Sequence, residues 1–468
     1  MLKIWIHTFI LFLGVILSWT LSDEPLQALG IFLLLFSIIS SFTLNKNRIL
    51  LEPINFFSLF SLTIVLVEFY FYHYGFLRSK FILATTFSQD IDYLFTKAIY
   101  LILLGYLCVC FSYFLFRRNI HYEIQPITSI NQRGLKYSIW IFGILSVLNF
   151  IYIVYHFAGG NLMAYMQNVS VREYEYMSGG VTGIFLDFGI FALFYWIYYN
   201  YRYKQKFSYY FFIFLAYVML MKYSQGRIFQ TIGTLIAIYI VTYFIYFIHS
   251  KGIIIKQLLG IVVLGLVSLI LYAYRLRSSL IFNSMAETDF LDQLTQFFQF
   301  EELSFYLIEK GNVPNIPVFM KIIDSWAADV GYLYGESILY PFYRFLPSAI
   351  SPENISVSNI VKKEWYVNIE GGALPPTCFG EMFANGNILG LILGMLLFGV
   401  FMAVVYNLLQ RYRNIVYLVI YAMIVSSFFF IYPKGESDNL NLISIFIFLV
   451  TYVFILVFSS LFYRQPRK

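Results

Sequence analysis

Five basic side chains depart from the charge pattern of this otherwise apolar chain, because they fall where we expect the outer membrane surface. Guanidinium groups hold phosphate oxygens bidentately, stay charged and can neutralise a departing diphosphate. The alternative is that each side chain only extends toward lipid headgroups. As a set they predict a diphosphate-binding site: Arg227, Arg275, Arg277, Arg344 and Lys434.

Three carboxylates are candidates for a general base beside such a site. Glu381 follows Gly380 at the start of an apolar run and is our first choice, with Glu336 and Asp329 as alternatives. A positioned carboxylate can remove the proton of an attacking hydroxyl. The structural alternative for Glu381 is a negative charge favoured by the dipole at a helix N-terminus.

An acidic pair, Asp90 and Asp92, has the D-x-D spacing of some metal-dependent glycosyltransferases. Two acids one residue apart are a weak signal in a polar loop, so we prefer a structural role for them. The three cysteines form no metal-ligand spacing. We therefore predict a reaction without metal or cofactor.

The composition places these residues in a membrane protein. Of the 468 residues, 60% are hydrophobic and only 12% are charged, so one soluble core cannot hide the apolar surface. Apolar runs of the length needed to cross about 30 Å of hydrocarbon recur along the chain. They predict an all-α polytopic membrane protein with about 12 transmembrane helices. The runs are 4–21, 26–44, 54–75, 94–116, 137–158, 181–200, 207–223, 228–248, 257–274, 384–408, 414–432 and 440–462.

Charge bias orients these spans, because Lys and Arg in short loops are retained in the cytoplasm. With the N-terminus inside, the internal loops and termini hold seventeen of the 31 basic side chains but only two acidic ones, Glu52 and Glu123. We predict that both termini are cytoplasmic. The segment between spans 9 and 10, which has twelve acidic and seven basic side chains between Tyr274 and Cys378, is then one large external loop.

This topology predicts three regions and excludes several activities. Residues 1–274 form spans 1 to 9, residues 275–383 form the external loop with short helices, and residues 384–468 form spans 10 to 12. No internal loop is long enough for a nucleotide-binding domain, and no phosphate-binding glycine motif follows a strand. All prolines fall in loops or at span edges, so we expect intact helices. Paired broken helices, as in many transporters, are not indicated.

The stretch GGALPPTCFGEMFANGNILG, from Gly371 to Gly390, resembles the signature of Wzy-type polysaccharide repeat-unit polymerases, the O-antigen polymerase family. The Gly226-Arg227 hairpin and the segment YRFLP around Arg344 are similar to elements of the same family. In this stretch Gly371 and Gly372 suit a tight backbone approach, and Pro375 stiffens the entry to the next span.

The resemblance implies a glycosyltransferase that joins undecaprenyl-diphosphate-linked oligosaccharides at the outer face of the bacterial cytoplasmic (inner) membrane. The resemblance implies that donor and acceptor are both lipid-linked and that membrane lipid surrounds the site. A chain-length regulator would be a further partner. No nucleic acid partner is expected. Two alternatives remain open. One is an O-antigen ligase-like transferase, and the other is a flippase for lipid-linked oligosaccharides.

Overall fold

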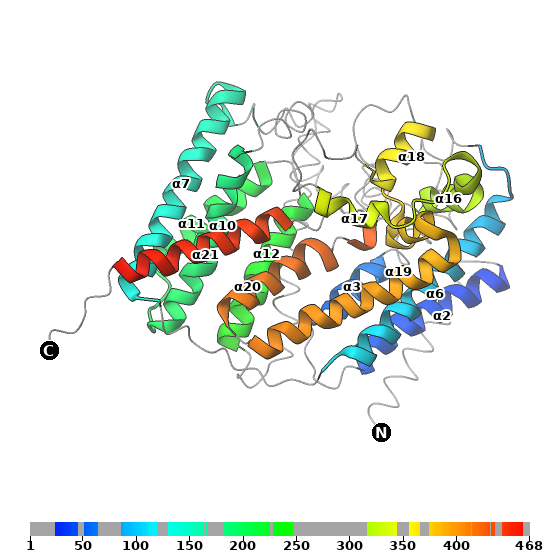
Figure 1. Ribbon diagram of the computed structural model, residues 1–468, viewed down its shortest axis with the longest axis horizontal. Coiled ribbons are helices and arrows are strands. Elements are labelled where there is room, and N and C mark those ends of the chain that lie inside the picture. The colour runs from blue at the N-terminus through cyan, green and yellow to red at the C-terminus, as the bar shows by residue number, and fades with distance from the viewer. Residues whose placement is uncertain are drawn as a thin grey trace, which may run out of the picture. The chain divides into compact units, whose positions relative to one another are not determined.

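The structure is a computed structural model, shown in Figure 1. It describes residues 24–44, 51–63, 86–118, 130–162, 165, 181–224, 228–247, 260, 316–343, 355–365, 374–412, 414–430, 432–435 and 442–461. Every regular element within these ranges is a helix, and none of them contains a strand. The all-α class predicted from the sequence is confirmed for this part of the chain.

The described elements are mainly α-helices, while η2 and η4 are short π-helices and η5 is a 3-10 helix. They are α2 (Pro25–Leu44), α3 (Pro53–Thr63), α6 (Ile91–Phe116), α7 (Gln132–Ala158), α10 (Val181–Arg202), α11 (Tyr209–Ser224), α12 (Ile228–Thr242), η2 (Tyr243–Phe247), α16 (Ile316–Asp329), α17 (Glu336–Tyr343), α18 (Val357–Trp365), α19 (Thr377–Tyr412), α20 (Ile415–Ile424), η4 (Val425–Phe429), η5 (Tyr432–Lys434) and α21 (Leu442–Leu461). Polar residues begin several of them. Asp90 Oδ1 accepts a hydrogen bond from Tyr93 N (3.0 Å) and caps α6, which gives the D-x-D pair a structural role.

Six of the described segments are long and apolar enough to cross a membrane. They are Pro25–Phe42, Ile91–Phe116, Gln132–Ala158, Thr377–Tyr412, Ile415–Lys434 and Leu442–Leu461. Three shorter apolar helices coincide with other predicted spans: Pro53–Leu62, Tyr209–Ser224 and Thr231–Tyr246. The predicted runs 4–21 and 257–274 lie outside the described residues, apart from residue 260. The total of twelve therefore stays a prediction.

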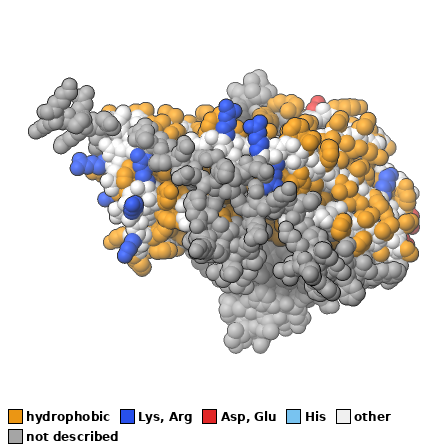
Figure 2. All heavy atoms as spheres, turned by 90° about the horizontal axis from the view of Figure 1, so that it is seen from below, with side chains coloured by type: hydrophobic (Ala, Val, Ile, Leu, Met, Phe, Trp, Pro, Cys, Tyr) orange, Lys and Arg blue, Asp and Glu red, His pale blue; other side chains and the backbone are white. Residues whose placement is uncertain are grey.

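Helix α19 shows how these helices suit a lipid environment. Its exposed apolar side chains recur at helical spacing along one face: Leu389, Leu393, Leu397 and Val404. In Figure 2 apolar side chains cover much of the described surface, with basic side chains among them. Exposed apolar surface on this scale requires lipid contact. The chain is a multi-pass helical membrane protein.

The helices group into two compact units, each built from separate parts of the sequence. Unit 1 comprises Met1–Ile120, Asp289–Asn407 and Phe428–Leu440, and unit 2 comprises His121–Thr288, Leu408–Ser427 and Asn441–Lys468. The predicted division into 1–274, 275–383 and 384–468 is one of membrane topology, and it stays a prediction.

In unit 1, α2 packs against α3 and α6, and α16 packs against α6. The ring of Phe57 on α3 lies near the centre of this packing, 6.0 Å from the Tyr106 ring and 5.4 Å from the Phe398 ring. Gly105 lets the start of α19 approach α6, because an added Cβ would lie 2.6 Å from the Phe379 ring. Aromatic packing thus joins α3, α6 and α19.

A buried carboxylate, Glu52, connects the beginning of α3 with the end of α6 and with α19. Glu52 is 0% exposed and accepts hydrogen bonds from Tyr113 Oη (2.9 Å), Arg117 Nη2 (2.8 Å) and Tyr406 Oη (2.9 Å). The side chain of Asn407 also bonds to the end of α6, through Phe116 O and Arg118 N, both at 2.9 Å. The charge and both tyrosines therefore hold α3, α6 and α19 in one register.

In unit 2, α10 packs along α7, α21 packs against α7, and α12 packs against α20. Small residues allow close approach. An added Cβ would lie 2.6 Å from Ser146 Oγ at Gly189 and 2.9 Å from the Ser426 main chain at Gly233. Close packing through glycine and serine is typical of helices in lipid, where hydrophobic burial does not drive association.

We predict that Arg117→Met destabilises the protein by about 3–5 kcal/mol, because it breaks the ion pair between Arg117 and the buried carboxylate of Glu52. The measurement is thermal unfolding of the purified protein in detergent micelles. The neighbouring Arg118 has an exposed side chain, so Arg118→Met is the matched control and should leave the melting temperature nearly unchanged. Equal melting temperatures for the two variants would refute the role of the pair.

Candidate active site at a broken helix

Helix α19 is interrupted near its beginning. The backbone leaves helical geometry at Gly386 (φ −177°, ψ 35°) and Asn387 (φ 57°, ψ −147°). Residues 377–385 therefore form a short helix, and the long span starts again at Ile388, whose N–H donates to Asn387 Oδ1 (2.8 Å). Our expectation of an intact helix over 384–408 is wrong, because asparagine adopts a positive φ at Asn387 and the helix is interrupted there without proline.

Glycines let the short helix lie directly on the span that follows it. An added Cβ on Gly390 would come 2.7 Å from the carbonyl oxygen of Met382, and one on Gly394 would overlap the Met382 side chain. The last glycine of the stretch GEMFANGNILG, Gly390, thus has a physical reason. It leaves room for the main chain of the first segment.

The main-chain carbonyls at the break are satisfied by α16 and by the turn between α16 and α17. Ala384 O accepts hydrogen bonds from Trp326 Nε1 (3.1 Å) and Leu333 N (3.2 Å). Asn385 O accepts one from Tyr334 N (2.9 Å). Helix ends leave such groups without intrahelical partners, and burial makes an unsatisfied carbonyl costly. The turn therefore replaces the bonds that a continuous helix would make.

The side chain of Asn385 joins the same parts. Its Oδ1 accepts from Gly335 N (2.8 Å), and its Nδ2 donates to Ser337 Oγ (2.8 Å) and to Glu381 O (2.8 Å). One buried amide thus connects the broken helix to the first residues of α17. Figure 1 shows α16, α17 and α18 gathered at this end of α19.

Glu381 lies on the short helix and is 1% exposed. Its carboxyl group is within electrostatic range of Tyr432 and Cys378. Thr377 Oγ1 accepts from Gly380 N (3.1 Å) at the beginning of the helix, and the preceding Pro375 is buried. The predicted residues Pro375, Gly380 and Glu381 therefore occupy one buried site.

Lys434 lies at the same end of α19. It is half-buried and belongs to η5, and the next residue, Gly435, has φ +100°. An added Cβ on Gly435 would overlap the main chain of Thr377. The structure thus brings this predicted phosphate ligand to the start of the helix that carries Glu381.

The other two candidate bases are exposed. Glu336 is the first residue of α17, directly after Gly335, which bonds to Asn385. Asp329 ends α16, and its Oδ2 accepts a hydrogen bond from Trp365 Nε1 (3.0 Å). Among the three candidates only Glu381 is removed from solvent.

The remaining predicted site residues lie outside the described part of the chain. They are Gly226, Arg227, Arg275, Arg277, Arg344, Gly371 and Gly372. Their roles stay predictions.

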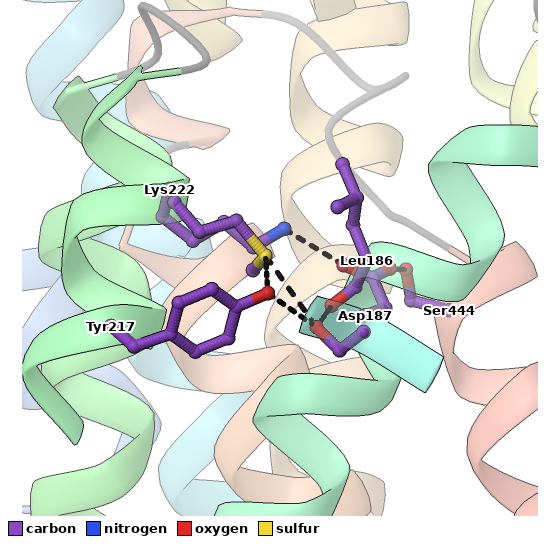
Figure 3. A network of polar contacts seen from close by, with 7 residues as sticks. Leu186, Asp187, Tyr217, Lys222 and Ser444 are labelled. Atoms are coloured by element: carbon purple, nitrogen blue, oxygen red, sulfur yellow. Dashed lines mark hydrogen bonds and ion pairs between the residues drawn. The ribbon is translucent and has the colours of Figure 1, made fainter. Parts of the chain in front are cut away.

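Sequence reasoning missed a buried ion pair in unit 2, shown in Figure 3. Lys222 Nζ on α11 lies 2.7 Å from Asp187 Oδ1 on α10, and Ser444 Oγ on α21 donates to Asp187 Oδ2 (2.5 Å). Ser146 Oγ on α7 bonds nearby to Leu186 O (3.2 Å). Ionisable residues within apolar helices are the signal that could have found this network.

A second carboxylate that sequence reasoning missed anchors α16. Asp324 accepts hydrogen bonds from Ser88 Oγ (2.6 Å), Ser88 N (2.9 Å) and Gln89 N (3.2 Å), and Lys321 Nζ lies 3.6 Å away. Burial alone would raise the pKa of this carboxyl group, but the hydrogen bonds and the ammonium group outweigh it and lower the pKa below its ordinary value. These contacts hold α16, and with it Trp326, against the segment before α6.

The helical architecture and the apolar surface define the chain as a multi-pass membrane protein. Residues 315–432 match the model of the family described as putative O-antigen polymerase. The match spans α16 to α20 and ends at Tyr432. No curated protein and no solved structure matches the chain.

We predict that Gly390→Ala destabilises the protein by about 1–3 kcal/mol, because the added methyl group meets a main-chain oxygen that cannot move aside. Gly386→Ala is the matched control, since a Cβ there has no atom within 4 Å. Thermal unfolding in detergent checks both variants. An unchanged melting temperature for Gly390→Ala would contradict the described packing.

We also predict an acid-dependent contribution from Asp324. A lowered pKa in the folded state means that the carboxylate stabilises the protein fully above its unfolded pKa of about 3.9, and that this stabilisation is lost as pH falls through the folded pKa. Asp324→Asn should therefore lower the melting temperature near neutral pH and differ less from wild type as the pH falls below about 3.9. A difference independent of pH would exclude this role.

Proposed function

We propose that the chain is a polymerase that joins undecaprenyl-diphosphate-linked oligosaccharide repeat units into a surface polysaccharide at the outer face of the cytoplasmic membrane. The observation that carries this proposal is the family match over 315–432. The matched region includes the broken helix, the buried carboxylate of Glu381 and the turn that is bonded to Asn385. A site built on such fixed elements suits a reaction that depends on positioning.

The proposed step is a transfer between two lipid-linked sugars. A hydroxyl oxygen of the incoming unit attacks the anomeric carbon of the growing chain. The bond from that carbon to the diphosphate oxygen breaks, and the lipid diphosphate leaves with the electron pair. The hydroxyl proton passes to a carboxylate. The diphosphate ester already activates the donor, so the step needs no nucleotide.

Glu381 is the proposed base. Its carboxyl group is shielded from solvent, whereas Glu336 and Asp329 are exposed. A base in a site closed to water keeps the abstracted proton from exchanging with solvent. Because Glu381 is buried at rest, the substrate reaches it only when neighbouring side chains such as that of Tyr432 move.

Cations would hold the diphosphate of the donor. Lys434 supports this role because it lies next to the start of α19, the helix that carries Glu381. Arg227, Arg275, Arg277 and Arg344 complete the proposed set, as their types and positions in the sequence suggest. Positive charge aimed at the leaving group lowers the barrier as the negative charge develops.

The proposed topology puts this chemistry outside the cell. Both termini are cytoplasmic in this proposal, and the inner membrane surrounds the spans. Donor and acceptor then enter from the bilayer. A chain-length regulator in the same membrane is a further proposed partner.

Glu381→Gln should lower the rate of polymer formation by at least about 100-fold, the lower end of what a general base contributes. The measurement is the length distribution of the polysaccharide made by membranes that contain equal amounts of each variant. Glu364→Gln is the control, because Glu364 is an exposed carboxylate on α18. Full-length polymer from Glu381→Gln, with the protein folded, would remove Glu381 from this role.

The broken helix also favours a second candidate, because many carriers of polar substrates bind them at interrupted helices. Deletion of the protein separates the candidates. Loss of a polymerase leaves single repeat units on the final acceptor, and loss of a flippase traps lipid-linked units facing the cytoplasm. Loss of a ligase would leave finished polymer on the lipid.

A further inference from the structure

The turn between α16 and α17 presents an aromatic ring to solvent. Tyr334 is 86% exposed, and its backbone is in the left-handed region (φ +48°), which is disfavoured for tyrosine. Gly331 (φ +87°) and Gly335 (φ +96°) flank it. The hydrogen bond from Tyr334 N to Asn385 O fixes this conformation. The fold therefore holds the main chain in place while the ring stays uncovered.

A carboxylate is held in a fixed position in the same region. Asp329 is exposed, and its Oδ2 accepts a hydrogen bond from Trp365 Nε1. The Trp365 indole is fixed in turn, by edge contact with Trp326 (centroids 5.8 Å apart) and by Lys321 Nζ, which lies 5.3 Å from its ring centroid. A carboxylate has about four acceptor sites, so one indole leaves it able to accept further hydrogen bonds.

Both groups belong to one short segment. Tyr334 lies five positions after Asp329, so their Cα atoms lie at most about 18 Å apart. An exposed aromatic ring offers an apolar face for the C–H groups of a sugar, and a fixed carboxylate accepts hydrogen bonds from sugar hydroxyls. A pyranose ring presents the complementary groups, an apolar face of C–H groups and hydroxyl groups that donate hydrogen bonds.

We propose that Tyr334 and Asp329 form a saccharide-binding platform that holds the sugar of the incoming acceptor. The assignment to the acceptor rests on the proposed function. Tyr334 stacks on the apolar face of a sugar ring, and Asp329 accepts hydrogen bonds from its hydroxyl groups. Trp365 is a positioning residue, because it orients the carboxylate. The platform is joined to the proposed base through Asn385, whose Nδ2 bonds to Glu381 O (2.8 Å).

The test measures binding of an oligosaccharide without its lipid. The probe is the repeat unit released by mild acid from the lipid-linked pool of the source cells. It is titrated against the full-length protein in lipid discs, with calorimetry as the readout. Tyr334→Ala should weaken binding by about tenfold, the scale expected when an aromatic anchor is removed. Tyr334→Phe keeps the ring and should bind as wild type does.

Matched variants separate the platform from general effects on the fold. Tyr209→Ala removes another strongly exposed tyrosine, 77% exposed on α11, and should leave affinity unchanged. Asp329→Asn keeps the shape of the side chain and should weaken binding several-fold. Trp365→Phe should show a smaller loss, because it only releases the carboxylate.

Wild-type affinity in both Tyr334→Ala and Asp329→Asn would overturn the platform, and so would an equal loss in Tyr209→Ala. If the polymerase proposal fails instead, the purified protein makes no polymer while the oligosaccharide still binds through Tyr334. If only the platform fails, polymer forms and Tyr334→Ala binds the oligosaccharide as wild type does. The two failures are therefore distinguishable.

Discussion

The site depends on one constraint: a helix interrupted in apolar surroundings must find new partners for the main-chain groups that it frees. The carbonyls of Ala384 and Asn385 find them in α16 and in the turn between α16 and α17. The same bonds fix where that turn lies. Because Glu381 lies one helical turn before Asn385, satisfying the break also fixes the main chain that carries the buried carboxylate.

Largely buried charges serve the same purpose in both units. In unit 1, Glu52 joins three helices through Arg117 and two tyrosines. In unit 2, Asp187 joins α10, α11 and α21 through Lys222 and Ser444. Apolar helices pack against one another in many registers with similar energy, whereas an ion pair is satisfied in only one. These pairs therefore specify how helices meet.

Much of the fold followed from composition and apolar run length. The spans at 94–116, 137–158 and 440–462 coincide closely with α6, α7 and α21, because a long apolar run in lipid has few structures other than a helix. The break in α19 was not predicted, because no proline lies within the span 384–408. The Asn-Gly-Asn sequence there is a turn signal that a hydropathy window averages away.

The site was predicted in part. The stretch around Glu381 was identified, and Lys434 does lie at the same helix start. The partners of the break were not, because Trp326 is 58 residues from Ala384 and its bond depends on tertiary structure. The ion pairs join residues 35 and 65 positions apart, which no local pattern can reveal.

The most direct test of the account is reconstitution of the purified protein in lipid vesicles with a defined undecaprenyl-diphosphate-linked repeat unit and no nucleotide. The products are separated by length, and released undecaprenyl diphosphate is measured. A polymerase yields lipid-linked chains of several repeat units, with one undecaprenyl diphosphate released for each new linkage. Repeat units that stay single, or that only cross the bilayer unchanged, would contradict the polymerase proposal.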